Sequence, residues 1–211
     1  GFDLEMKLHA TPDAQAQIIL DKQHGDALTA QGEGDLTLRL NTLGKFEMFG
    51  DYVITSGYYL FTLENVINKR FEIDPGSSIS WSGNPDNAEI DFLTTYRQRT
   101  SIAVLLNDLE GTQYKGRVPV ECRLLINGRL FSPQIRFEVD FPTIESNAKA
   151  RIASVLSDET ELNRQVFSFL LFRSFVTPLI FNTHGGGVTA SGVAASTGSE
   201  MLSNRVSEFL N

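Results

Sequence analysis

The chain has 211 residues, one cysteine and a net charge of −8 at neutral pH. It is long enough to bury a sizeable core without disulfides, and Cys122 has neither a cysteine partner nor metal ligands near it in the sequence. The acidic balance argues against nucleic acid as a partner, because neutralising phosphates requires a clustered basic face that this sequence lacks.

Apolar and polar residues alternate through most of residues 1–142, which is the period of a strand with one buried face. Residues 2–8 form the first such segment, in which large apolar residues alternate with charged ones. Turn formers separate the segments, among them residues 32–34 (Gly-Glu-Gly) and 127–128 (Asn-Gly), the strongest hairpin signal in the chain. The pattern predicts a mainly β fold built on a single antiparallel sheet whose apolar residues share one face.

Glycine and aromatic residues are concentrated in residues 44–63. Glycine inside a strand permits sharp bending and a close approach between neighbouring backbones, which a strongly curved sheet requires. The composition of this segment therefore favours a curved sheet.

Helical spacing replaces the alternation after Pro142. The first expected helix covers residues 146–156, without glycine or proline inside it. Ser157 is expected to cap a second helix, because its side-chain oxygen can accept a hydrogen bond from a free N–H group of the first turn. This second helix should run to about Val176, since Pro178 cannot continue it.

The second expected helix is unusually apolar, with six apolar residues among the seven from 166 to 172. Two interpretations remain open: a lid packed over the open sheet, or an exposed helix that docks on a membrane or a barrel. The longest apolar stretch, residues 166–181, is interrupted by polar residues and falls short of the roughly 20 residues that span a bilayer.

Residues 182–198 are rich in glycine, serine and alanine and are expected to form a flexible tether. Apolar residues at helical spacing follow in residues 199–211, where we expect an amphipathic, partner-binding helix. The expected domains are thus the sheet (1–142), a helical segment (143–181), the tether and the terminal helix. The partner-binding candidates are Met201, Leu202, Val206, Phe209 and Leu210.

The sequence offers no arrangement of residues suited to catalysis or metal binding. The three histidines, His9, His24 and His184, are far apart and outside any metal-ligand spacing. Glycines 185–187 lack the Lys-Ser/Thr of a phosphate loop, and no nucleophile elbow is present. We therefore expect a non-enzymatic protein without a cofactor or a metal. The first residues alternate like a strand, so the chain is expected to be part of a longer polypeptide.

A series of short segments occurs in an order that is typical of one family. The segments are residues 50–52 (GDY), 56–61 (SGYYLF), 69–73 (KRFEI), 76–85 (GSSISWSGNP), 88–91 (AEID), 95–96 (TY), 127–130 (NGRL) and 133–137 (PQIRF). This ordered series resembles the C-terminal domain of TamB, the translocation and assembly module subunit. The resemblance covers nearly the whole chain and is strongest from about residue 44 to residue 142.

The resemblance implies a curled, β-taco-like sheet with an apolar concave face and no catalytic residues. It implies a protein of the AsmA-like, bridge-like lipid transfer group, anchored in the inner membrane of a diderm bacterium and exposed to the periplasm. The expected partners are phospholipid and a BamA-family outer-membrane barrel (TamA-like), with membrane contact through the full-length protein. The implied role is outer-membrane biogenesis.

Two clients are compatible with such a sheet: acyl chains held in an apolar groove, or a barrel strand paired with the sheet edge. A carbohydrate-binding β-sandwich is the alternative function, for which Trp81, Tyr58 and Tyr59 would have to lie exposed beside carboxylates. The groove candidates are Leu36, Leu38, Leu40, Tyr59, Phe61, Phe71, Ile73, Ile79, Trp81, Ile90 and Phe92.

Overall fold

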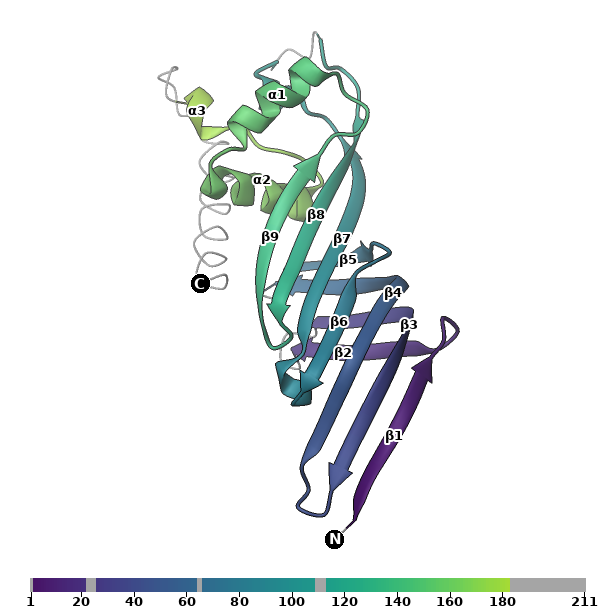
Figure 1. Ribbon diagram of the computed structural model, residues 1–211. Helices are drawn as coiled ribbons and strands as arrows, with labels where there is room; N and C mark the ends of the chain where they lie inside the picture. Colours follow the sequence, from purple (N-terminus) through teal and green to yellow (C-terminus); the bar gives the residue numbers. More distant parts are fainter. Residues whose placement is uncertain (1, 22–25, 64–65, 109–112, 183–211) are drawn as a thin grey trace. The chain divides into compact units, whose positions relative to one another are not determined.

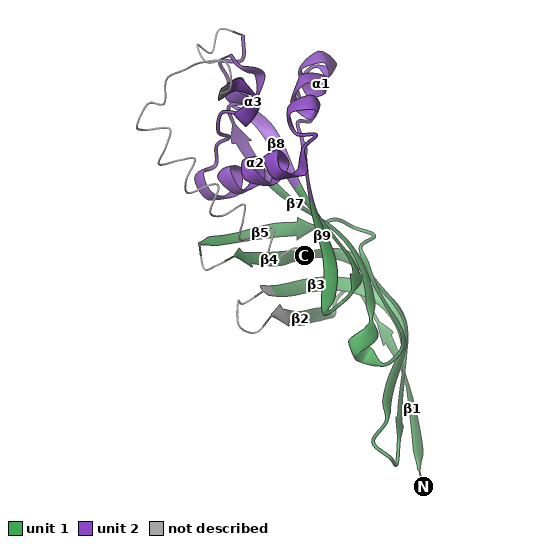
Figure 2. Ribbon diagram, turned by 90° about the vertical axis from the view of Figure 1, so that its left-hand side faces the viewer, with its two compact units in different colours: residues 1–96, 123–136 green, residues 97–122, 137–211 purple. Residues whose placement is uncertain are grey.

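The computed structural model describes residues 2–21, 26–63, 66–108 and 113–182. The chain divides into two compact units, unit 1 with residues 1–96 and 123–136, and unit 2 with residues 97–122 and 137–211 (Figure 2). The expected terminal helix with its five partner-binding candidates, and the tether from residue 183 onward, lie outside the described residues.

The described residues form one antiparallel sheet of nine strands, so the predicted mainly β fold is confirmed (Figure 1). The main path of the sheet follows the order β1-β3-β4-β5-β7-β8-β9, while β2 pairs with β3, and β6 pairs with β4 and β7. The strands are β1 (Asp3–Ala10), β2 (Gln15–Asp21), β3 (Asp26–Asn41), β4 (Phe46–Leu63), β5 (Ile67–Ile73), β6 (Ser78–Gly83), β7 (Glu89–Thr100), β8 (Val118–Arg129) and β9 (Ser132–Asp140).

Strands β3 and β4 are long enough to belong to two lobes of unit 1, and they bend where the lobes meet (Figure 2). In the first lobe, β1 and β6 flank residues 32–41 of β3 and residues 46–54 of β4. In the second lobe, β2 and β5 flank residues 27–31 of β3 and residues 57–63 of β4. The register between β3 and β4 shifts at the junction, which is how a bulge bends a sheet.

The turn expected at residues 32–34 is wrong, because these residues lie inside the continuous strand β3. Glycines on β3 and β4 allow these two strands to pack closely instead. A Cβ atom on Gly34 would lie 2.0 Å from the carbonyl oxygen of Asp51, and one on Gly50 would lie 2.1 Å from the carbonyl oxygen of Asp35. The close backbone approach expected from glycines within the strands is therefore present.

Replacing Gly34 by alanine is expected to lower the free energy of unfolding by about 1–3 kcal/mol, because a methyl group would overlap a backbone oxygen. Urea unfolding followed by the fluorescence of Trp81 would measure the loss. Gly116→Ala is the matched control, since nothing lies within 4 Å of the Cβ position there. Equal stability losses in the two variants would contradict the close-packing explanation.

The hairpin signal at residues 127–128 does not mark the turn between β8 and β9. Both residues lie within β8, and the turn falls at Leu130 and Phe131. Leu130 is 6% exposed and its backbone N–H donates to the carbonyl oxygen of Ala88 at 2.8 Å. Burial of Leu130 and this hydrogen bond accompany a turn three residues beyond the expected one.

The helices of unit 2 are α1 (Ser146–Val155), α2 (Glu159–Phe172) and α3 (Leu179–Asn182), and 3-10 turns η1 (Pro85–Asn87) and η2 (Ala103–Leu106) complete the described elements. The first expected helix is confirmed to within one residue. The second begins and ends differently from the expectation: Asp158, not Ser157, caps α2, and the helix ends at Phe172 rather than near Val176.

Helix α2 is buried in unit 2 over most of its length. Phe167 packs edge-on against Phe137 of β9, and Phe169 stacks on Phe175, with ring centroids 5.6 and 5.3 Å apart. This burial favours the packed interpretation of α2 over the exposed docking helix. No helix in the described part of the chain is both long and apolar enough to cross a membrane.

Candidate functional site: an apolar cavity between the two lobes

The first lobe has two chemically different faces. Residues paired across an antiparallel sheet share a face, and three successive rows of one face are apolar. The rows are Leu4, Leu40 and Phe46; then Met6, Leu38 and Met48; then Leu8, Leu36 and Trp81, with Gly50 between the last two.

The opposite face of the same strands is charged. Arg39 donates to Glu5 at 3.0 Å, and its guanidinium lies 5.1 Å from the centre of the Phe49 ring. His9 Nδ1 lies 2.7 Å from a carboxylate oxygen of Asp35. These pairs suit a water-facing surface, so the apolar face is the one that requires a cover or a client.

An apolar cavity of about 280 Å³ lies on that face, between the two lobes. Its walls come from β1, β3, β4 and β6 of the first lobe and from β2 and β3 of the second, and every lining residue is uncharged. The lining residues are Leu8, Ala10, Ala14, Gln15, Ala16, Ile18, Leu28, Ala30, Leu36, Met48, Tyr52, Ile79 and Trp81.

The wall of the cavity includes exposed residues, among them Leu8 on β1 and Gln15 at the start of β2. Leu36 on its inner wall is 7% exposed, whereas Leu8 on β1 is 43% exposed. Exposure continues outward along the same apolar face, through Met6 at 47% and Leu4 at 49%. An apolar surface therefore leads from the rim of the lobe into the cavity.

Two aromatic side chains in the wall have properties that bear on a ligand. Trp81 is the only tryptophan of the chain, so its fluorescence reports on the cavity alone. Tyr52 is 6% exposed, and within the described residues its hydroxyl is buried without a hydrogen-bond partner. Buried tyrosine hydroxyls usually have a partner.

The predicted groove residues fall into three groups. Leu36, Ile79 and Trp81 line the cavity. Leu38 and Leu40 are half-buried on the same face of the first lobe, outside the cavity. The others lie in the core between 0 and 4% exposed and do not line the cavity: Tyr59, Phe61, Phe71, Ile73, Ile90 and Phe92.

Sequence reasoning missed the cavity residues on β2, and it missed Tyr52 and the alanines. The alternation in residues 2–8 did carry a signal for Leu8, because that segment is strand-like and apolar on one face. No local signal pairs β2 with the far end of β3, so Ala16 and Ile18 could be found only from the fold.

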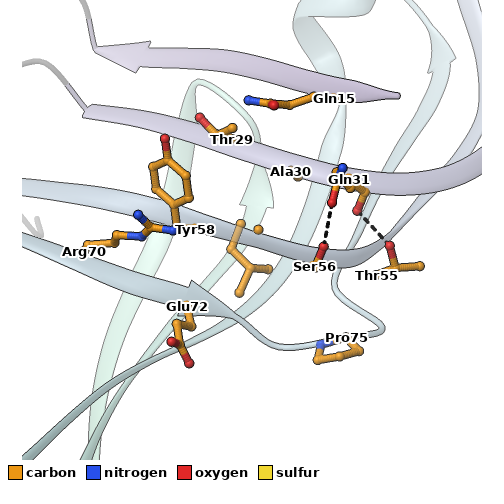
Figure 3. A pocket seen from close by; sticks show the side chains of 12 residues that line it. Gln15, Thr29, Ala30, Gln31, Thr55, Ser56, Tyr58, Arg70, Glu72 and Pro75 are labelled. Carbon is orange, nitrogen blue, oxygen red and sulfur yellow. Dashed lines mark hydrogen bonds between the residues drawn. The ribbon is translucent and has the colours of Figure 1, made fainter. Parts of the chain in front are cut away.

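A second depression, of about 480 Å³, lies on the opposite face of the second lobe and is polar (Figure 3). Ser56 donates to the side-chain oxygen of Gln31 at 3.2 Å, and Thr55 donates to the backbone oxygen of Gln31 at 3.1 Å (Figure 3). The guanidinium of Arg70 lies 3.8 Å from the centre of the Tyr58 ring. One face of this ring is therefore already occupied.

The three aromatic residues of the carbohydrate alternative do not come together. Tyr58 stacks with Arg70 on the polar face, Tyr59 is 2% exposed, and Trp81 lines the apolar cavity. They are therefore not exposed together beside carboxylates, as the carbohydrate alternative requires.

The possible metal ligands and the single cysteine form no reactive arrangement in the described part of the chain. No group of three or more His, Cys, Asp or Glu side chains there is placed to hold a metal ion. Cys122 is fully buried, and burial raises the pKa of its thiol, so the sulfur stays protonated and unreactive.

The first lobe thus combines a sheet with one apolar face, an open apolar cavity and a charged opposite face, which is the arrangement of a binding module for apolar ligands. The chain matches the model of the TamB C-terminal domain over residues 1–211, its whole length, and belongs to this family. Membership implies a bacterial envelope protein with a role in outer-membrane protein assembly or translocation. No curated protein sequence matches the chain.

Proposed function

We propose that the cavity between the two lobes shelters an acyl chain of a phospholipid while the headgroup stays outside. The observation that carries the proposal is the continuous apolar path from exposed Leu8 on β1 to buried Leu36 and half-buried Trp81. A charged headgroup has no counter-charge among the lining residues, so it is expected to remain at the rim.

The size of the cavity suits part of one acyl chain. Its volume of about 280 Å³ lies near the lower end of ligand pockets, which span roughly 300–1,000 Å³. A chain that buries about five CH₂ groups gains about 4 kcal/mol before the cost of ordering it. Such affinity is weak, which suits a module that passes lipid on rather than storing it.

In the cell, we place this activity in the periplasm of a diderm bacterium, in a full-length protein anchored in the inner membrane. The domain acts without catalysis or a cofactor. A BamA-family barrel (TamA-like) is the proposed protein partner, and an outer strand of the sheet is the proposed contact. Strand β9 ends the main path of the sheet among the described residues, so an added strand would extend the sheet there.

Quenching of Trp81 fluorescence tests the acyl-chain proposal. A phospholipid carrying bromine atoms on its acyl chain is expected to quench Trp81 strongly, because heavy atoms quench on contact and Trp81 lines the cavity. The same phospholipid brominated on its headgroup is the control and should quench weakly. Equal quenching by both lipids, or none by either, would contradict the proposal.

A further inference from the structure

Unit 2 contains a groove of about 430 Å³ beside the outer strand β9, which we call the β9 groove. Five consecutive residues at the end of this strand, 137–141, line one side of it. Side chains alternate between the two faces of a strand, so a groove on one face would be lined by every second residue. A groove lined by each residue in turn runs along the edge of the strand.

The edge of β9 offers backbone pairing to a further strand. β9 ends the main path of the sheet, so among the described residues its strand partner, β8, lies on one side only (Figure 1). Pro133 near the start of β9 has no N–H to donate, but residues 134–141 contain no proline. Residues 137–141 span about 14 Å in extended form, which suits an added strand of about five residues.

The other side of the β9 groove is formed by the helices and is apolar. Ile152 and Ala153 of α1 contribute to it, together with Leu156 and with Leu162 of α2. Ala153 is exposed and both leucines are half-buried, so this wall can be reached from solvent. A strand paired with β9 would place every second side chain against this wall and the others toward water.

The charged side chains of the β9 groove lie at the edge of the strand. Lys149 of α1 donates to Asp140 at 3.3 Å and so joins the two walls. Phe137 packs on α2, so alternation places Glu138 on the opposite face, where it is exposed. Its carboxylate favours a lysine or a neutral polar residue on the solvent side of an added strand.

We infer that the β9 groove accepts an amphipathic β-strand of an unfolded outer-membrane protein, which pairs with the edge of β9 and lays its apolar side chains on α1 and α2. The inference rests on the strand contact of the proposed function and names a client strand as its occupant. Strands of membrane barrels alternate between apolar lipid-facing residues and polar ones. A groove with one apolar wall and one solvent side suits this pattern, and the family has a role in outer-membrane protein assembly.

Binding of a model strand to the 211-residue chain tests the inference. The probe is a fluorescein-labelled peptide of about nine residues in which valine alternates with threonine and lysine. Its control has the same side chains on N-methylated backbone amides, which cannot donate to β9. Three lost hydrogen bonds, each a factor of at least about 2, should weaken binding about tenfold or more, as measured by fluorescence anisotropy. Equal affinities of the two peptides would overturn strand addition.

Ala153→Arg is the matching change in the protein, because Ala153 is an exposed residue in the wall of the β9 groove. A guanidinium there would crowd and charge the surface that the apolar side chains need, so peptide binding should weaken at least about tenfold. Ala150→Arg is the control, since Ala150 is exposed on the same helix outside the groove lining. Equal effects of the two variants would overturn the assignment of this groove.

Hydrogen exchange locates the bound peptide. Deuterium uptake in residues 134–141 should fall when the peptide is added, because pairing protects amides on the edge of β9. The N-methylated peptide should protect them less. Uptake in β1, at the other end of the sheet path, should not change. Protection of β1 in place of β9 would overturn the inference.

Two further readouts separate the inference from the proposed function. Trp81 lines the cavity in unit 1 and the β9 groove belongs to unit 2, so Ala153→Arg should leave quenching by the acyl-brominated lipid unchanged. Absence of peptide binding, with normal quenching and normal binding of a BamA-family barrel, would overturn the inference and leave the proposed function standing. Absence of quenching with normal peptide binding would overturn the acyl-chain proposal and leave the inference standing.

Discussion

Replacing Arg164 by methionine is expected to destabilise unit 2 by about 3–5 kcal/mol, because it leaves the carboxylate of Glu161 buried without its counter-charge. Arg164 is 5% exposed and Glu161 is 6% exposed, and the two form a bidentate pair with bonds of 2.7 and 3.2 Å. Arg164 also donates to the backbone oxygen of Thr177 at 2.8 Å, and this bond would be lost as well.

The cluster around this pair holds the segment that follows α2. Gln165, fully buried, donates to the backbone oxygen of Val176 at 2.7 Å and accepts from its N–H at 3.0 Å. The same side-chain nitrogen donates to Glu161 at 2.8 Å. These bonds satisfy the backbone of a partly buried segment that has no strand partner in the described part of the chain, which explains the buried polar residues of α2.

Thiol labelling during urea unfolding measures the effect of Arg164→Met, because Cys122 belongs to unit 2 and is fully buried. Arg39→Met is the control: it breaks an exposed pair with Glu5, whose side chains are 55% and 48% exposed, and should cost at most about 1 kcal/mol. The double change Glu161→Leu with Arg164→Met should be less harmful than Arg164→Met alone. Equal effects of Arg164→Met and Arg39→Met would show that the buried pair is dispensable.

Met48→Arg is expected to weaken acyl-chain binding at least tenfold without unfolding the domain. Met48 is half-buried in the cavity wall, and a guanidinium there would hold water in the cavity and exclude part of the chain. Excluding two CH₂ groups costs about 1.6 kcal/mol, which already exceeds the roughly 1.4 kcal/mol of a tenfold change. Calorimetric titration with a short-chain phosphatidylcholine measures the affinity.

Thr37→Arg makes the same change of charge on the opposite face of the first lobe, where Thr37 pairs with Phe49. It should leave acyl-chain binding unchanged. Circular dichroism should show native sheet content for both variants. Equal loss of binding in the two variants would place the effect on net charge or folding rather than on the cavity.

The alternation of apolar and polar residues predicted the sheet and the face on which the cavity lies. Sidedness is a local property of a strand, so Leu36, Ile79 and Trp81 could be assigned to the apolar face from the sequence. Whether a residue on that face lines a cavity or fills the core is decided by what packs on it. Phe71 and Phe92 share the apolar period and are fully buried.

The cavity itself depends on pairings between distant segments. It exists because β3 changes register after Gln31 and carries β2 on one lobe and β1 on the other. The local sequence around the glycines at this bend predicts a turn, but in the structure these glycines allow close packing against β4. The position of Tyr52 follows from Gly32, a relation between two strands that no single segment records.

Lipid extraction and mass spectrometry of the gently purified chain test the central claim most directly. The cavity between the lobes should retain phospholipid in the wild type and in Thr37→Arg, and Met48→Arg should purify with much less. The predicted result is phospholipid that co-purifies with the wild-type chain, or is taken up from added vesicles, in clearly larger amount than with Met48→Arg. A wild-type chain that purifies free of lipid, with its fold intact and with no uptake from added vesicles, would contradict it.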